Sequence, residues 1–595
     1  MRVADYIFRT LADSGFRHAF LVTGGGAMHL NDALRLEKRI TPVCCHHEQA
    51  CAIAAEGYYR ASGQMPVVTV TTGPGGTNAL TGVIGAWQDS IPMIVVSGQV
   101  KFSTTIESCR DIPLRQLGDQ ELNIVDVVRP ITKYAKFISD PLSIGAELDK
   151  ALKISRSGRP GPVWLDIPLN VQGATLPDGY HCELSTSDPA IRKFDLSAVI
   201  DLLKASRRPV FIGGHGIELD DAATAFQALV EKCRIPVLTT FNGMNVIPSD
   251  HTLNFGRIGT LGQRAANFVL QNADLIITVG TRNNIRQVSY NWENFAKRAK
   301  KVVVDIDAAE LAKPTVRPDI AIESSAADFI SATLHEVSRK TIGNWKNWLA
   351  WCEERRWRFP VHTQEQMLCN DVGINPYHFM YVLTNICPAD VNIVAGNGTA
   401  CVALFQTGIV KRGQKIFWNS GCASMGYDIP AALGAAVATG RETICLAGDG
   451  SAMMNLQELE TISFRKLPIK IFILDNNGYS SIRQTQTNLF SPELMGCDPS
   501  SGVGLPDFRK VATAFDLPSV VMERHEGLEG KIRAFLSLDG PALAVVKIPS
   551  GLGFSPKLSA RRNPDGSIVS PSLEDMSPFL DKAVVAENMI PKEKE

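Results

Sequence analysis

Short, almost continuously apolar runs alternate with helix-like patterns over roughly the first 172 residues of the chain. Such runs at residues 19–23, 67–71 and 93–97 are typical of strands buried on both faces of a parallel sheet. A turn rich in glycine and proline at 158–162 then leads into a last apolar run at 163–167. The pattern predicts a first α/β unit.

Two further units follow the same kind of pattern. The second begins at the apolar run 209–214, continues through 274–280 and ends near 302–307, and the third occupies roughly 372–550. A polar stretch around 178–193 is expected to be a linker. We therefore expect an α/β chain of three doubly wound domains, each with a mainly parallel sheet. The expected domain boundaries are 1–175, 190–335 and 370–550, followed by a tail at 551–595.

The first and third units share an order of motifs. The glycine turn at 73–75 is followed by Pro92 and an apolar run, and the glycine turn at 448–450 is followed by Pro468 and another apolar run. The common order of strand, glycine turn, helix, proline and strand suggests that the two units have related sheets.

Composition adds little to this picture beyond excluding some partners. The 595 residues are 45% hydrophobic and 20% charged, as in an ordinary globular protein, and the formal charge of −1 gives no electrostatic reason to expect nucleic acid or a membrane surface. No apolar run reaches the roughly 18 residues of a membrane span. The N-terminus has no signal-peptide pattern, and the 13 cysteines lack paired-ligand spacing, which favours reduced thiols. We expect a cytoplasmic protein.

The strongest chemical signal lies between residues 443 and 478. An apolar run at 443–447 leads into Gly448-Asp449-Gly450-Ser451, and Asn476 follows one helix and one strand later. Glycines let the backbone approach a phosphate closely, and a helix start offers free N–H groups to that anion. A carboxylate and an amide oxygen, completed by diphosphate oxygens and water, suit Mg²⁺. A lone glycine–acid turn is common, but this spacing predicts a diphosphate and magnesium site. The candidate metal ligands are Asp449, Asn476 and Gly478.

This segment resembles the cofactor signature of thiamine diphosphate (ThDP) enzymes, and residues 1 to about 550 are similar to the acetolactate synthase branch of that family. The resemblance extends through all three predicted domains. It is carried by His47-Glu48-Gln49, Ala54-Ala55-Glu56-Gly57-Tyr58, Thr72-Gly73-Pro74-Gly75, Gln120-Glu121, Arg129-Pro130, 158–168, Asp305-Ile306-Asp307, Met425-Gly426-Tyr427 and Pro430-Ala431-Ala432.

The resemblance implies roles for particular residues. Glu48 lies at the position of the family's catalytic glutamate, whose carboxylate favours the pyrimidine tautomer that removes the thiazolium proton. Gln120 is expected to touch substrate, and Met425 is expected to hold the two cofactor rings in a bent shape. The other implied ThDP contacts are Gly396, Asn397, Gly398, Gly448, Gly450 and Ser451.

The middle domain resembles the family's FAD-binding domain. Gly213, Gly214, Arg282 and Arg286 would suit a diphosphate, because glycine turns expose backbone amides and an arginine offers a fork of donors. Many relatives keep this fold without flavin. The resemblance implies FAD with a structural rather than a redox role.

The resemblance also implies assembly. In this family the first and third domains of different subunits face each other across the cofactor. We therefore expect a homodimer or homotetramer with active sites at the subunit interface, where Glu48 of one chain serves ThDP held by another.

Two positions depart from acetolactate synthases. Asp119 stands where the family has a Phe that lines the substrate pocket, and Thr485 stands where it has a Trp that narrows the pocket. Polar groups there favour a hydroxylated acceptor over a methyl ketone. The alternatives are that the chain makes acetolactate, or that it joins the acyl unit to a polar acceptor such as a keto-sugar nucleotide.

We thus expect a ThDP-dependent carboligase, a transferase that decarboxylates a 2-oxo acid, with pyruvate as the expected donor, and joins the acyl unit to a carbonyl acceptor. The rivals are a simple decarboxylase or flavin-linked oxidase, and a non-catalytic relative that binds ThDP or FAD. Residues 565–580 of the tail would either cover the active site as a lid or remain disordered.

Overall fold

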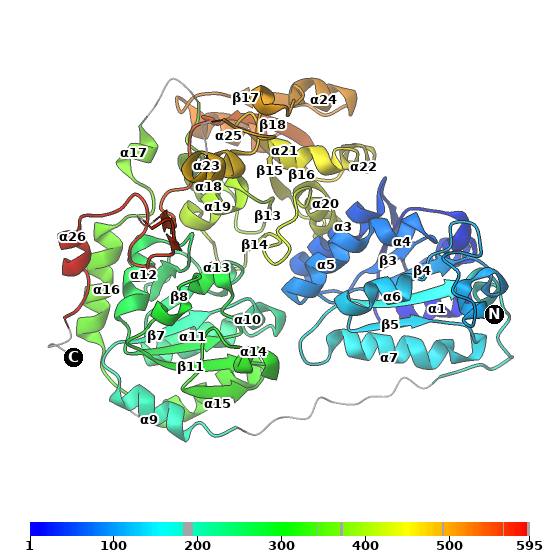
Figure 1. The fold of residues 1–595 in the computed structure, drawn as a ribbon, viewed down its shortest axis with the longest axis horizontal. Helices are drawn as coiled ribbons and strands as arrows, with labels where there is room; N and C mark the ends of the chain where they lie inside the picture. Colours follow the sequence, from blue (N-terminus) through cyan, green and yellow to red (C-terminus); the bar gives the residue numbers. More distant parts are fainter. Residues whose placement is uncertain (183–193, 341, 369–372, 491–492, 563–564, 592–595) are drawn as a thin grey trace.

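Three parallel sheets, each of six strands, make up the fold of the chain in a computed structural model (Figure 1). The structure describes residues 1–182, 194–340, 342–368, 373–490, 493–562 and 565–591. The prediction of three α/β units with parallel sheets is confirmed. The exact domain boundaries stay predictions, and most of the expected linker, residues 183–193, lies outside the described residues.

The first sheet is covered by helices on both faces. Its strands, in spatial order, are β2 (Thr41–Cys44), β1 (His18–Leu21), β3 (Val67–Val70), β4 (Ile94–Gln99), β6 (Val163–Pro168) and β5 (Tyr134–Phe137). Its helices are α1 (Val3–Asp13), α2 (Met28–Leu36), α3 (Glu48–Ser62), α4 (Pro74–Asn78), α5 (Leu80–Asp89), α6 (Ile124–Val128), α7 (Ile144–Arg156) and α8 (Leu169–Gln172). The residues predicted as buried strands at 67–71, 93–97 and 163–167 correspond to β3, β4 and β6.

The central sheet lies at the lower left of Figure 1. Its strands, in spatial order, are β12 (Ile320–Glu323), β11 (Lys300–Asp305), β10 (Leu275–Val279), β7 (Pro209–Gly213), β8 (Val237–Thr239) and β9 (Asn254–Arg257). Its helices are α9 (Ser197–Ala205), α10 (Gly216–Leu219), α11 (Ala223–Cys233), α12 (Arg264–Asn272), α13 (Ile285–Val288), α14 (Ala308–Ala312) and α15 (Ala326–Arg339). Two further helices, α16 (Lys346–Arg358) and α17 (Gln364–Met367), connect this unit to the third.

The third sheet repeats the strand order of the first, as the shared motif order suggested. Its strands are β14 (Lys415–Phe417), β13 (Asn392–Ala395), β15 (Thr443–Gly448), β16 (Ile469–Asp475), β18 (Ala542–Lys547) and β17 (Ser519–Met522). Its helices are α18 (Pro376–Ile386), α19 (Thr399–Thr407), α20 (Asp428–Thr439), α21 (Asp449–Ala452), α22 (Glu458–Phe464), α23 (Ser480–Leu489), α24 (Phe508–Ala514) and α25 (Leu528–Leu536).

One hydrophobic core joins the first and third units, and α3 and α20 lie at its centre. These helices approach closely because both carry small residues. A Cβ on Gly57 would lie 2.2 Å from the Ala431 carbonyl oxygen, and one on Gly434 would lie 1.9 Å from that of Ala54. The later residue of α3 thus meets the earlier residue of α20, so the two helices run antiparallel.

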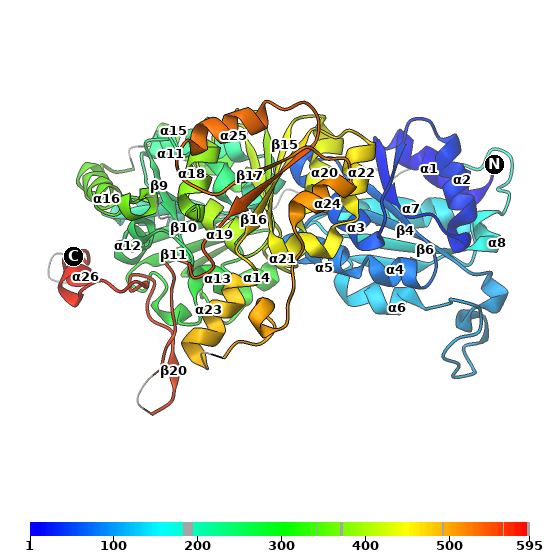
Figure 2. The same ribbon diagram turned by 90° about the horizontal axis from the view of Figure 1, so that it is seen from above.

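The C-terminal tail packs on the central unit. It contains β19 (Arg561–Arg562) and β20 (Ile568–Val569), a small hairpin that projects from the body in Figure 2, and α26 (Lys582–Glu587). Leu573 and Met576 are buried, and Asn267 of α12 donates to the Leu573 carbonyl at 3.1 Å. The residues between β20 and α26 therefore belong to the surface of the central unit. None of the described helices is long and apolar enough to cross a membrane.

Because α3 and α20 cross so closely, we expect a single added methyl group at the crossing to destabilise the protein. Gly434→Ala would place a Cβ against the Ala54 carbonyl, and we expect it to lower the free energy of unfolding by about 1–3 kcal/mol or more. Differential scanning calorimetry should show a lower Tm. Gly530→Ala, in α25 with open space around its Cβ position, is the matched control and should be neutral or stabilising by up to ~1 kcal/mol. Equal Tm values for Gly434→Ala and wild type would contradict the packing.

Candidate active site

The carboxyl ends of three neighbouring strands bring the predicted diphosphate and metal residues together. β13, β15 and β16 are adjacent in the third sheet. They deliver the turns at 396–398, 448–451 and 476–478 to one edge, the usual place for ligands in open parallel sheets.

Asp449 is the hydrogen-bonding centre of this edge. Its side chain is buried and accepts from the backbone N–H groups of Gly450 at 2.7 Å, Asn476 at 3.1 Å and Gly478 at 2.9 Å. Burial raises the pKa of the Asp449 carboxyl to about 6, and the backbone hydrogen bonds oppose that rise. The carboxylate therefore ties the turn after β15 to the turn after β16.

The Asn476 side chain presents an oxygen without a partner. Its Oδ1 atom is buried and accepts no hydrogen bond from the described residues, while its Nδ2 atom lies 3.5 Å from the Thr399 hydroxyl. A buried amide oxygen left unpaired is costly, so a bound cation beside Asp449 would satisfy it. The described residues hold no cluster of three or more His, Cys, Asp or Glu side chains suited to a metal. The donor set thus fits Mg²⁺ that takes its remaining oxygens from a bound diphosphate and water.

The glycines of the site fall into two groups. Gly396, Gly450 and Gly478 are required by the protein itself, because a Cβ would lie 2.1 Å from Asp428 Oδ2, 2.1 Å from the Tyr479 ring and 2.0 Å from the Cys497 carbonyl respectively. Gly398 and Gly448 face open space, apart from Ser451 Cβ at 4.0 Å from the Gly448 position. These two are the positions where a phosphate could approach the backbone.

The loop that carries Met425 is fastened to this edge. The Ser451 hydroxyl donates to Asp428 Oδ2 at 2.5 Å and accepts from the Gly426 N–H at 2.8 Å. The Asn397 side chain donates to the Ser424 carbonyl at 2.7 Å. Ser451 and Asn397 therefore position the loop in this structure, and the Met425 side chain is 37% exposed.

Glu48 lies at the first turn of α3, near the carboxyl end of the first sheet. Its carboxylate is buried and accepts from Asn78 Nδ2 at 3.0 Å. The glycine turn is close by, because a Cβ on Gly75 would lie 3.6 Å from Glu48 Oε1. Gly73, with φ of 59°, leaves room for the Gln120 carbonyl, which would lie 2.3 Å from a Cβ there. The Gln120 side chain itself is exposed in a single chain, as are Asp119 and Thr485.

A buried polar network that sequence reasoning missed supports this turn. The Asp166 carboxylate accepts from Ser97 Oγ at 2.5 Å and from Gln99 Nε2 at 3.1 Å. Gln99 also donates to the Leu122 carbonyl at 2.8 Å and accepts from Thr72. Burial raises the pKa of Asp166 to about 7, and the two side-chain hydrogen bonds oppose the rise. An acidic residue inside the apolar run 163–167 was the available signal.

Glu48 and the predicted metal residues lie far apart within one chain. Ala54 of α3 and Gly434 of α20 are in contact where the two helices cross. Glu48 lies about six residues before Ala54, and Asp428 lies about six residues before Gly434; because the helices are antiparallel, these two residues lie on opposite sides of the crossing. At 1.5 Å per residue, roughly 18 Å separates Glu48 from the Asp428 end of α20, where Ser451 and the metal turn lie. The backbone N–H of His46 instead donates to Glu458 of α22 at 2.9 Å.

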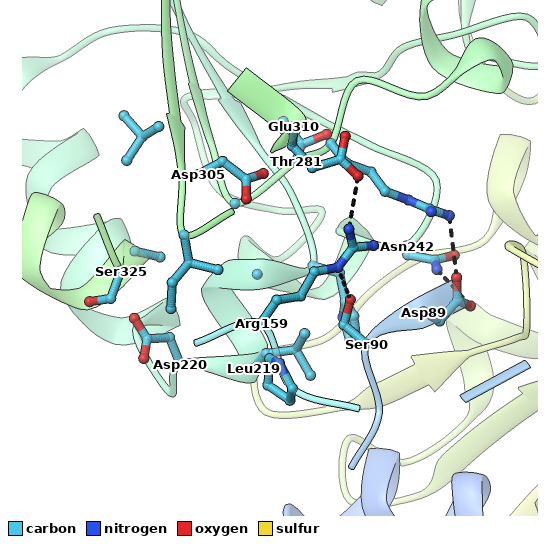
Figure 3. Close-up of a pocket in the computed structure, with 18 of the residues that line it drawn as sticks. Asp89, Ser90, Arg159, Leu219, Asp220, Asn242, Thr281, Asp305, Glu310 and Ser325 are labelled. Atoms are coloured by element: carbon cyan, nitrogen blue, oxygen red, sulfur yellow. Dashed lines mark hydrogen bonds and ion pairs between the residues drawn. The ribbon is translucent and has the colours of Figure 1, made fainter. Parts of the chain in front are cut away.

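A cavity of about 680 Å³ lies between the first and central units (Figure 3). Arg282, predicted to bind a dinucleotide, lines it, together with Arg159 and Phe241. Gly213 and Gly214 are not among its lining residues, so their contact with a dinucleotide stays a prediction. A Cβ on Gly214 would lie 2.3 Å from the Gly280 carbonyl, so packing also requires a glycine there. Arg286 stacks over Phe241 at 5.0 Å from the ring centre.

Unpaired polar atoms in this cavity fit a polar ligand. Gln88 Oε1 and Asn242 Oδ1 are buried and lack a partner among the described residues. Arg282 is partly exposed at the wall, and Arg159 donates to Glu310 at 2.9 Å and to Ser90 at 2.8 Å. The lining thus offers a partly exposed Arg282, an Arg159 that is already paired with acidic residues, and unpaired oxygens, and this mixture fits a flavin dinucleotide.

Comparisons with known proteins agree with this geometry. The thiamine pyrophosphate enzyme family models match in order: the N-terminal TPP-binding domain at 1–123, the central domain at 196–333 and the C-terminal TPP-binding domain at 396–546. Acetolactate synthase 1, chloroplastic, of Oryza sativa subsp. japonica is 31% identical over 92% of this chain and 84% of its own. The acetolactate synthase large subunit of Lactococcus lactis subsp. lactis is 30% identical over 95% and 96%. The isozyme 1 large subunit of Escherichia coli is 29% identical over 92% and 93%.

The buried Asp166 predicts an inverse dependence of stability on pH. The pKa of Asp166 is about 7 in the folded protein, against an ordinary pKa of 3.8 when the carboxyl is exposed. The contribution of Asp166 to the free energy of unfolding is therefore complete below pH 3.8 and is lost as the pH rises through 7. Asp166→Asn does not titrate. We expect the free energy of unfolding of wild type to fall by roughly 2 kcal/mol relative to this variant between about pH 5 and pH 7.

Chemical denaturation at several pH values measures this difference. Asp201→Asn, a change at an exposed carboxylate of α9, is the control and should stay parallel to wild type. Parallel curves for Asp166→Asn and wild type would show that the carboxyl titrates normally.

Proposed function

The chain belongs to the thiamine pyrophosphate enzyme family, and on that premise we propose that it is a ThDP-dependent carboligase. It decarboxylates a 2-oxo acid, with pyruvate as the proposed donor, and joins the acyl unit to a carbonyl acceptor. This proposal rests on the presence of two features in one chain. A buried Glu48 lies at the edge of the first sheet, and at the edge of the third sheet Asp449 lies beside an Asn476 oxygen that has no partner among the described residues.

Particular residues would hold the cofactor and its metal. Asp449, the Asn476 amide oxygen and the Gly478 backbone would bind Mg²⁺, and the open backbone at Gly398 and Gly448 would receive the diphosphate. The partly exposed Met425 would support the rings. When bound, ThDP supplies an acidic thiazolium carbon that stabilises the negative charge left by decarboxylation.

The Glu48 carboxylate would form a charged hydrogen bond with the pyrimidine ring of the cofactor. Its carboxylate is buried and is oriented by Asn78, so water competes poorly for that hydrogen bond. Asn78 thereby fixes which oxygen of Glu48 remains available. The Gly73–Gly75 turn and the Gln120 backbone close the same side of the site.

Assembly follows from the separation of the two halves. Because roughly 18 Å lies between Glu48 and the Asp428 end of α20, one chain cannot supply both to the same cofactor. We propose a homodimer or homotetramer in which Glu48 of one chain faces Asp449 of its partner. The described cysteines are free thiols, which supports a cytoplasmic location.

The central cavity is the proposed site of FAD. Arg282 and Arg159 would face the diphosphate, and Gln88 and Asn242 would face the heterocycle. The flavin would fill the junction between the first and central units, which is a structural role.

Asp119 and Thr485 favour a second candidate for the acceptor, a hydroxylated compound such as a keto-sugar nucleotide. Both side chains are exposed in a single chain, on surfaces that assembly would bring to the site, and both are polar where acetolactate synthases have rings. A wider and more polar pocket would hydrogen-bond a sugar better than a second pyruvate.

Replacing the glutamate tests the proposed catalytic role. Glu48→Gln keeps the size of the side chain but cannot supply the charged hydrogen bond, so we expect CO₂ release from pyruvate to fall by roughly 10²–10⁴-fold while ThDP affinity changes only a few-fold. Glu529→Gln, on an exposed face of α25, should retain wild-type turnover. Undiminished turnover in Glu48→Gln would remove Glu48 from the mechanism.

The acceptor is tested by incubating the protein with ThDP, Mg²⁺ and pyruvate and following CO₂ and product mass. We expect slow CO₂ release that rises when a keto-sugar nucleotide is added. The double variant Asp119→Phe with Thr485→Trp should shift the product toward acetolactate. Prompt acetolactate formation by wild type at about 10 s⁻¹ from pyruvate alone would rule out the polar acceptor.

A further inference from the structure

A buried cluster of charges, which has no role in the proposed chemistry, lies where the three units meet. Arg60 of α3 donates to Glu56 at 2.8 Å and to Asp89, the last residue of α5, at 2.7 Å. The three side chains are at most 2% exposed. The Glu56 and Asp89 carboxylates thus share one guanidinium inside the protein, and a buried carboxylate needs further hydrogen-bond donors.

The loop that carries Met425 supplies further donors. Asp89 accepts from the backbone N–H groups of Ser420 at 3.1 Å and Gly421 at 3.0 Å. Glu56 accepts from the Asn419 side chain at 3.0 Å. Residues 420–424 have small side chains, so these hydrogen bonds hold the first part of the loop, while Asn397 and Ser451 hold its end near Met425.

Asp89 also forms part of the wall of the central cavity. Asn242 donates to it at 3.2 Å, and the Arg282 guanidinium lies 3.8 Å from its other oxygen. Figure 3 shows Asp89 and Asn242 at one end of the cavity, with Asp220 and Ser325 at the other. Arg282 is the second cation that balances the two carboxylates, and its side chain is still 31% exposed toward the cavity.

We propose that Asp89 is a positioning residue that couples occupation of the central cavity by a flavin dinucleotide to ThDP binding at the Met425 loop. This inference rests on the proposed function. A dinucleotide that contacts Arg282 and Asn242 fixes them against Asp89, which holds the N–H groups of Ser420 and Gly421. The loop is then ordered before ThDP arrives, so the second ligand avoids that entropic cost and the coupling is positive. Linkage requires ThDP to tighten flavin binding by the same factor.

The experiment titrates FAD into the full-length protein, followed by flavin fluorescence, with and without saturating ThDP and Mg²⁺. We expect ThDP to lower the FAD Kd of wild type by at least about fivefold. In Asp89→Asn, which loses an acceptor for the loop, the ratio of the two Kd values should fall to within about twofold. A purely structural role would weaken both Kd values equally and leave their ratio unchanged.

Two further variants keep the test decisive. Arg282→Gln changes a partly exposed side chain, so it should fold and should also lose the coupling even if Asp89→Asn does not fold. Asp220→Asn alters the opposite end of the cavity and should keep the wild-type ratio. Equal FAD affinity with and without ThDP in wild type, or an unchanged ratio in the variants, would overturn the coupling. Absence of FAD binding by a protein that binds ThDP and releases CO₂ would also overturn it, while leaving the carboligase proposal intact.

Discussion

The close antiparallel crossing of α3 and α20 is the constraint on which the rest of the structure depends. Gly57 and Gly434 let the two backbones touch, and the shared core around them fixes the first sheet against the third. The same crossing sets Glu48 at one end of the helix pair and the metal turn at the other. Packing in the core thereby keeps Glu48 and the turn that carries Asp449 apart within one chain, and this separation is the physical ground for the proposed assembly.

Buried carboxylates fix the positions of the loops at the ends of the packed strands and helices. Asp449 organises the turns after β15 and β16, and Asp89 with Glu56 organises the loop before α20. In both places a buried carboxylate accepts from backbone N–H groups of a loop, and Asp89 is in addition ion-paired with the buried Arg60 guanidinium. The loops proposed to bind the cofactor are therefore held by neighbouring elements. Residues 420 and 421 of the third unit, for example, are held by Asp89 of the first.

Sequence reasoning predicted the architecture because apolar runs report burial on both faces of a parallel sheet. It predicted that Asp449 and Asn476 lie close together, as they do, because a strand, a glycine turn and a second strand place them at the ends of adjacent strands. It missed the contact of Glu56 with Asn419, since nothing local reports a hydrogen bond across about 360 residues. Asp166 carried a local signal, since it is an acidic residue inside an apolar run, but its partners Ser97 and Gln99 could not be predicted from the sequence. Gly214 stays a predicted ligand contact, and its packing against the Gly280 backbone, which requires a glycine there for a separate reason, could not be predicted from the sequence.

In the proposed assembly, Glu48 and Asp449 of one active site come from different chains. Co-expression of Glu48→Gln and Asp449→Asn chains with different tags, followed by tandem purification, would give heteromers in which one site of each pair combines an intact Glu48 with an intact Asp449. We expect inactive homomers and heteromers with about half of the wild-type CO₂ release per pair of chains. Heteromers as inactive as the two homomers would mean that Glu48 and Asp449 act within the same chain, which would contradict the proposed assembly.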